Sequence, residues 1–121
     1  MRRDHPTQVR RFVIAGGKGP WFRVRVVGTS MLPTLAPGQG VVVARFARWE
    51  VGSIVAVADP RAPERMLVKR VRSLRGAGVE VRGDNEAAST DSRSFGLVPP
   101  SSIAGRVVYR YGPGGPPGRV R

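Results

Sequence analysis

The stretch MLVKRVRSLRGAGVEVR, residues 66–82, carries the clearest local signal in this sequence. It contains two segments rich in β-branched residues, 66–74 and 79–82, on either side of the turn sequence RGAG at 75–78. Glycine readily adopts the positive φ angles that a tight turn between antiparallel strands requires. The stretch therefore predicts a β-hairpin, in which alternate side chains of each strand point to opposite faces.

The same two-residue period extends outward along the chain. Towards the N-terminus, apolar side chains alternate with arginines and fall on one strand face at Phe22, Val24 and Val26. Further runs rich in β-branched residues follow at residues 40–46, 53–58 and 103–109. The chain contains 16 Gly and 11 Pro, which excludes a helical bundle. The pattern predicts an all-β domain of antiparallel strands and hairpins.

The composition is that of one small, strongly basic domain. Its 121 residues include 21 Lys+Arg against 8 Asp+Glu, for a formal net charge of +13. There is no Cys, and His5 is the only histidine, so we expect neither a metal site nor a thiolate nucleophile. The apolar runs are far shorter than the roughly 20 residues of a membrane-spanning helix, and no secretory signal is visible. We therefore expect a cytoplasmic protein.

The two ends differ in composition from the rest of the chain. Residues 1–11 are polar and basic, and residues 112–121 read GPGGPPGRVR. Neither end contains enough apolar surface to offset the entropy lost on ordering. We expect a flexible N-terminus over 1–11, one folded domain over 12–111 and a flexible tail over 112–121.

Ser30 is a candidate nucleophile, because nucleophilic catalysis without Cys or a usable His needs a Ser or Thr with another base. It follows the strand at residues 22–27, where Gly28 permits a sharp bend. Such a bend presents a hydroxyl beside backbone N–H groups, as an oxyanion hole requires. Taken alone, the same residues also fit a strand-ending turn with a solvated serine.

Lys69 is a candidate base, because strand alternation places it on one face with Leu67 and Val71. An ordinary lysine is almost fully charged near neutral pH, and burial among apolar neighbours lowers its pKa. Taken alone, Lys69 also fits a side chain whose stem covers apolar surface while its ammonium reaches water.

The segment GDNEAASTDSRSFG, residues 83–96, is a polar loop too long for a simple hairpin turn. Its residues can form Asx turns, an ion pair and a hydrogen bond to a nearby ammonium. A solvated surface loop is the alternative interpretation.

Together these three segments resemble the signal peptidase I family. The resemblance is carried by GTSMLPTL at 28–35, VKRV at 68–71, and the loop motif from Gly83 through Ser89 to Pro99. The segments occur in the family's order and cover about residues 22–110. The resemblance implies the small, partly open, all-β barrel of the signal peptidase I catalytic core.

The resemblance also implies a Ser/Lys serine endopeptidase that needs no cofactor. Ser30 matches the family's nucleophile and Lys69 its general base, with Ser89 orienting the lysine. The residues that support the dyad or the oxyanion hole are Gly28, Met31 and Ser89. The remaining matches structure the loop, and the last two of them form an ion pair: Asp84, Asn85, Asp91 and Arg93.

Departures from the family's pattern bear on the substrate. Gly28 replaces a hydroxyl that some members place two residues before the nucleophile, which leaves the Ser30 amide as the oxyanion donor. Membrane-bound signal peptidases carry an N-terminal anchor, and no spanning segment precedes Ser30 here. The chain is similar to the short peptidases that mature nickel-type superoxide dismutase. The implied partner is therefore a precursor protein with an N-terminal leader, such as the nickel superoxide dismutase precursor, cut by a monomeric enzyme.

Two alternatives stay open. One is processing of exported proteins at a membrane, with peripheral contact through Phe12, Val13, Ile14, Trp21 and Phe22. The other is a non-enzymatic basic β module that binds nucleic acid, as the charge of +13 allows. Aromatic residues make up only 7% of the chain, which argues against a base-stacking surface.

Overall fold

The computed structural model describes residues 19–121, so the predicted flexible N-terminus at 1–11 lies outside the described residues. The strands are β1 (Trp21–Arg25), β2 (Gly40–Ala44), β3 (Ile54–Asp59), β4 (Ala62–Arg75), β5 (Gly78–Arg82), β6 (Ile103–Tyr111) and β7 (Gly118–Arg119). The short helical segments are η1 (Glu86–Ala88), α2 (Ser92–Phe95) and η2 (Pro100–Ser102). Within 19–121 no helix has the length and apolarity needed to span a membrane.

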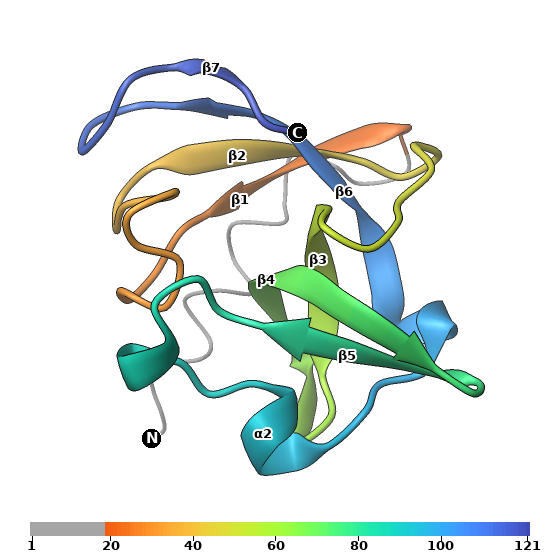
Figure 1. Ribbon diagram of the computed structural model, residues 1–121. Coiled ribbons are helices and arrows are strands. Elements are labelled where there is room, and N and C mark those ends of the chain that lie inside the picture. The colour runs from red at the N-terminus through yellow and green to blue at the C-terminus, as the bar shows by residue number, and fades with distance from the viewer. Residues whose placement is uncertain (1–18) are drawn as a thin grey trace.

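The strands form one antiparallel sheet in the order β1-β2-β6-β3-β4-β5, with β7 also paired to β6. Strand β6 joins the two halves, because it pairs with β3 at its start and with β2 further along (Figure 1). The end strands β1 and β5 do not pair with each other, so the sheet is curved but not closed into a barrel. The predicted all-β, antiparallel fold is confirmed.

The hairpin predicted over residues 66–82 is present as β4 and β5. Its pairs run from Arg70↔Arg82 to Arg75↔Gly78, and Gly76 in the turn has a φ of 60°. Strand β4 begins at Ala62, earlier than predicted, because its first part pairs with β3. Among the described strands, none pairs with residues 62–69 of β4 on the side that β5 occupies further along.

The core consists of two apolar clusters on opposite faces of the curved sheet. Strand β3 lies between them and is buried on both faces: Ile54 and Ala56 belong to one cluster, Val55 and Val57 to the other. In β1 the predicted alternation is present, since Phe22 is 1% exposed and Trp21 is 57% exposed. Apolar side chains of β1 to β6 thus form most of the core, without a long helix packed on the sheet within residues 19–121.

The structure places the end of the predicted flexible tail on the sheet. Strand β7 pairs with β6 at Tyr109↔Arg119, and the Val120 amide donates to the Val108 carbonyl at 3.0 Å. The side chain of Val120 is only 7% exposed. The tail's glycines supply the turn, Arg119 pairs with Tyr109 in the strand, and the apolar side chain of Val120 anchors the segment in the core. The Gly/Pro content therefore hid a short strand.

Candidate active site

Ser30 lies in a turn directly after β1. Gly28 has a φ of 82°, a conformation that other residues avoid, and this lets the chain bend away from the strand. The Leu35 amide donates to the Met31 carbonyl at 2.9 Å, which closes one helical turn. The side chains of Met31 and Leu35 are 1% and 0% exposed, whereas Ser30 is partly exposed. Met31 thus supports the serine by anchoring its turn in the core.

The loop after β5 packs against this turn. The Asn85 amide donates to the Ser30 carbonyl at 2.8 Å, and Asn85 Nδ2 donates to the Thr29 carbonyl at 3.1 Å. Gly83 permits the close approach, because a Cβ there would lie 2.6 Å from the Ser30 carbonyl oxygen. Sequence reasoning misses this role of Gly83, although its place at the start of the loop motif is a signal.

Lys69 is 4% exposed and lies on β4 opposite Val55 of β3. Its predicted neighbours Leu67 and Val71 pack in the second core cluster, on the same face of the strand. The Lys69 Nζ donates to Ser89 Oγ at 3.1 Å. Burial lowers the pKa of Lys69, and this effect outweighs the opposing attraction of the Asp91 carboxylate. The site therefore favours an uncharged lysine more than water does.

Asp91 completes a chain of hydrogen bonds that begins at Lys69. The Ser89 hydroxyl donates to Asp91 Oδ2 at 2.8 Å, so its oxygen is free to accept from the lysine. Burial raises the pKa of Asp91, but hydrogen bonds from Arg93, the Gly83 amide and Ser89 outweigh it and hold that pKa well below its usual range. Arg93 Nε lies 3.0 Å from Asp91 Oδ1, which is the ion pair that the sequence predicts.

Asp84 ties the Ser30 turn to β4 through a second set of bonds. Its carboxylate accepts from Arg70 Nε at 2.8 Å and Arg70 Nη2 at 2.7 Å, a bidentate pair. Thr34 Oγ1 also donates to Asp84, at 2.6 Å. Sequence reasoning places Asp84 in the loop but misses Arg70 and Thr34 as its partners. Those partners lie 14 and 50 residues away, so only the fold brings them together.

Ser30 and Lys69 line one small cavity of about 60 Å³, which we call the dyad cavity. Its other walls come from β1, from the Ser30 turn and from the start of β4: Val24, Arg25, Val26, Val27, Met31, Met66, Leu67 and Val68. The cavity therefore lies between the outer edge of β1 and the unpaired part of β4. Within 19–121 no group of three or more His, Cys, Asp or Glu side chains is placed to hold a metal ion.

The arrangement brings together several groups that hydrolysis by a serine uses. A partly exposed hydroxyl and a buried amine with a lowered pKa share a cavity, and a carboxylate-anchored hydroxyl fixes the amine. The cavity also opens between two strand edges, where an extended peptide can pair with the backbone.

Similar proteins include proteases of the mitochondrial inner membrane. The chain is 37% identical over 115 residues to the mitochondrial ATP-independent inner membrane protease subunit 1a of Arabidopsis thaliana, covering 73% of this chain and 68% of that protein. It is 32% identical over 117 residues to the mitochondrial inner membrane protease subunit 1 of Schizosaccharomyces pombe, covering 76% and 74%. Against subunit 2 of Homo sapiens it is 35% identical over 100 residues, covering 61% and 57%.

These relatives overturn the expected cytoplasmic location. The expectation rested on the absence of an apolar segment, but the similar proteins are named as proteases of an inner membrane. The length of apolar runs can reveal a spanning segment, but it does not reveal other forms of attachment to a membrane.

The sequence also matches the protein family described as signal peptidase, peptidase S26. The match covers residues 12–85 and 78–112, which include the Ser30 turn, β4 and the whole loop that carries Ser89 and Asp91. On this match and on the similarity to the inner membrane proteases, the chain belongs to the signal peptidase S26 family.

Proposed function

We propose that this chain is a serine endopeptidase with Ser30 as nucleophile and Lys69 as general base. The observation that carries the proposal is the state of Lys69: it is 4% exposed, bonded to Ser89 and in one cavity with Ser30. A structural lysine would direct its ammonium to water instead. Here the amine is buried, and burial lowers the free energy needed to remove its proton.

In the proposed reaction, uncharged Lys69 takes the proton from Ser30 Oγ as that oxygen attacks the scissile carbonyl. The Ser30 amide stabilises the oxyanion, as Gly28 offers no side-chain donor. Lys69 then protonates the leaving amine, and water activated by the same lysine releases the acyl group. Ser89 positions the amine throughout by accepting one of its N–H bonds.

The shape of the dyad cavity supports a particular kind of substrate. An extended peptide can form backbone bonds with the edges of β1 and β4, which leaves its side chains alternating in and out of the cavity. About 60 Å³ beside Val24, Val26 and Met66 suits a small apolar side chain. We propose a precursor with such a residue next to its cleavage site.

We propose further that the enzyme works on its precursor at a membrane surface, as the names of its relatives suggest. The nickel superoxide dismutase precursor implied by the sequence stays one candidate substrate, although the relatives reported above are not named for it. Those relatives are named as subunits, so the predicted monomer has no support from them.

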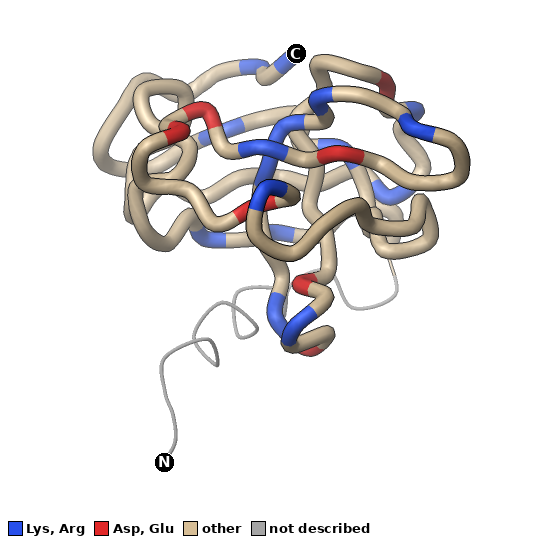
Figure 2. Tube along the Cα trace, turned by 60° about the horizontal axis from the view of Figure 1, so that its bottom comes forward, with Lys and Arg blue, Asp and Glu red and all other residues tan. Residues whose placement is uncertain are grey.

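The pairing of many basic residues argues against the nucleic-acid alternative. Basic residues occur throughout the described trace (Figure 2). Many of them are paired with carboxylates, namely Arg61, Arg65, Arg70, Arg72, Arg75, Arg82 and Arg93. These seven arginines share five carboxylates, so much of their charge is offset within the protein.

The test is incubation of candidate precursors with the protein and its Ser30→Ala variant, followed by mass analysis of the products. The precursors are the nickel superoxide dismutase precursor and membrane-anchored leader peptides in vesicles. Ser30→Ala should abolish cleavage and leave the thermal melt unchanged. Ser94→Ala, which changes an exposed serine of the loop that carries Ser89, should cleave normally. Cleavage by Ser30→Ala at the parent rate would refute the proposal.

A further inference from the structure

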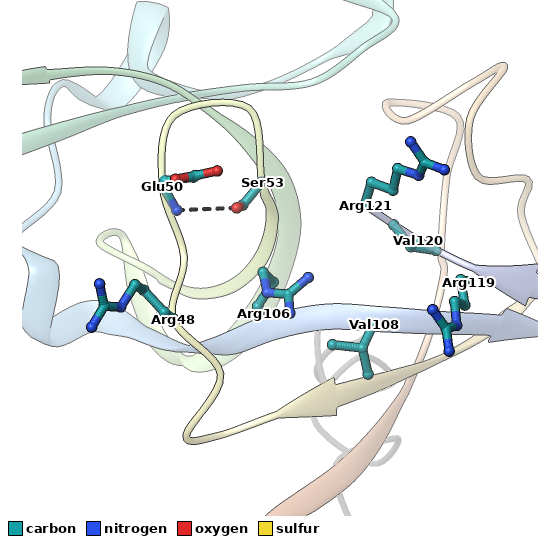
Figure 3. A pocket seen from close by; sticks show the side chains of 8 residues that line it. All are labelled: Arg48, Glu50, Ser53, Arg106, Val108, Arg119, Val120 and Arg121. Carbon is teal, nitrogen blue, oxygen red and sulfur yellow. Dashed lines mark hydrogen bonds between the residues drawn. The ribbon is translucent and has the colours of Figure 1, made fainter.

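A second cavity, larger than the dyad cavity, lies along the edge of β6 that faces away from β2. Strand β3 pairs with that edge as far as Arg106, and β7 pairs with it from Tyr109 onward. The space between the start of β3 and β7 is a cavity of about 770 Å³. We call it the arginine pocket, and it is lined by Arg48, Glu50, Ser53, Arg106, Val108, Arg119, Val120 and Arg121 (Figure 3).

The pocket gathers positive charge from three separate segments. Arg48 comes from the β2–β3 loop, Arg106 from β6, and Arg119 from β7, with Arg106 standing between the other two in Figure 3. Arg121 adds a fourth guanidinium. The only acidic lining residue is Glu50, so the lining of the pocket carries an excess of positive charge.

These four arginines lack partners among residues 19–121, unlike the arginines that ion-pair elsewhere. No ion pair or side-chain hydrogen bond involves any of them. The Nε atom of Arg106 is moreover buried and has no hydrogen-bond acceptor. A buried donor without an acceptor costs free energy. A ligand in the pocket can supply acceptors to the exposed guanidinium nitrogens of these arginines.

We propose that the arginine pocket binds a ligand that carries phosphate groups. Guanidinium groups pair with phosphate through two parallel hydrogen bonds, and the several oxygens of a phosphate can accept from arginines on different sides. Val108, which is partly exposed, offers apolar surface for the organic part of a phosphate ester. The volume lies within the range of about 300–1,000 Å³ that is typical of small-molecule sites. This inference goes beyond peptidase activity and does not depend on it.

The ligand source is either a soluble phosphate ester or a phospholipid headgroup, and two assays separate them. Calorimetry measures the binding of inorganic pyrophosphate, and sedimentation measures binding to phosphatidylcholine vesicles with and without phosphatidic acid. Arg106→Gln/Arg119→Gln should weaken binding at least about tenfold in whichever assay detects it, because two charged hydrogen-bond donors are lost. The matched control Arg23→Gln/Arg72→Gln removes the same net charge outside the pocket and should change affinity by less than about twofold.

Because Arg106 is partly buried, a second double variant, Arg48→Gln/Arg119→Gln, changes only exposed residues and keeps the test valid if the first variant misfolds. Equal weakening by the pocket and control variants would overturn the proposal, since it would show general attraction to a basic protein. So would an absence of binding in both assays, or tighter binding of a poly-glutamate peptide than of pyrophosphate. Peptidase activity is recorded alongside and should be the same in the two pocket variants as in the parent.

Discussion

The two polar regions of this molecule differ in how their charges are balanced. Around Lys69, the nearby acid Asp91 is already paired with Arg93 and bonded to Ser89. Around Arg106, by contrast, the guanidiniums that line the arginine pocket have no carboxylate partner within residues 19–121. The first region is balanced internally, and the second carries uncompensated charge.

This difference explains opposite chemical uses of a basic side chain. Burial lowers the pKa of Lys69 and outweighs the attraction of the Asp91 carboxylate, which the repulsion from Arg93 partly offsets. An arginine cannot lose its proton in the same way, so a cluster of arginines can lower its energy only by taking an anion from outside. A region whose charges are paired internally thus favours an uncharged lysine that can act as a base. A cluster of unpaired arginines favours the binding of an anion.

The largest expected effect comes from replacing the base itself. Lys69→Met keeps the apolar stem and should lower the cleavage rate on the order of 10²–10⁴-fold, because general-base catalysis is lost. Lys69→Arg should be equally inactive, since a guanidinium keeps its proton. Thermal melts should show that Lys69→Met stays folded, and its full activity would exclude Lys69 as the base.

The same comparison predicts how the parent enzyme responds to pH. The pKa of Lys69 is lowered, so the uncharged fraction, and with it the cleavage rate, should rise with pH and level off below the usual pKa of a lysine. Initial rates of precursor cleavage measured between about pH 6 and 9 test this expectation. A flat profile over that interval would contradict a lysine base.

The next largest effect should be a loss of stability when the charge of Asp91 is removed. Asp91→Asn removes the charge that Arg93, Ser89 and the Gly83 amide share, and should lower the free energy of unfolding by about 3 kcal/mol. The folded pKa of Asp91 lies below its ordinary 3.8, so its contribution is present above that pH and is lost on acidification. Urea unfolding at several pH values measures both effects. Glu64→Gln, an exposed acid, should change neither.

The surroundings of Lys69 can be predicted from the sequence better than the ion pairs or the arginine pocket, for physical reasons. Alternation along β4 predicts that Lys69 shares a face with Leu67 and Val71, because a strand's period is fixed by its backbone. Ion pairs such as Arg70 with Asp84 depend on which strands become neighbours, and alternation alone does not determine that order. The arginine pocket is less predictable still, since it exists only because β3 pairs with β6 as far as Arg106 and β7 pairs with β6 from Tyr109 onward, which leaves a gap between them.

The β7 strand illustrates a second limit. Gly and Pro indicate turns, and a window of residues 112–121 is dominated by them. One valine sufficed to dock the segment, because Val120 fills space beside Val108 and the glycines allow the reversal. Composition averages over a segment, whereas packing depends on single side chains.

Gly83→Ala should have a smaller effect on stability but a clear one on catalysis. The new Cβ would lie 2.6 Å from the Ser30 carbonyl oxygen and 2.6 Å from Ser89 Cβ, so one of the two must shift. We expect a loss of about 1–3 kcal/mol in the free energy of unfolding. We also expect a fall in kcat at temperatures where the variant is fully folded. An unchanged kcat would mean that the spacing of the two serines tolerates movement.

The smallest effect should come from the arginine pocket, and its sign is the opposite. Without a ligand, Arg48→Gln removes one of several like charges, so the variant should be more stable than the parent by less than about 1 kcal/mol at low salt. Arg23→Gln, an exposed arginine outside the pocket, removes the same charge where fewer arginines are near, and should gain less. In about 1 M salt the Debye length is only about 3 Å, so the gain should disappear. Chemical unfolding with urea, which is uncharged, measures these differences at both salt concentrations. A loss of stability in Arg48→Gln at low salt would mean that its guanidinium has a partner within the protein after all, and that the pocket is as balanced as the Lys69 region.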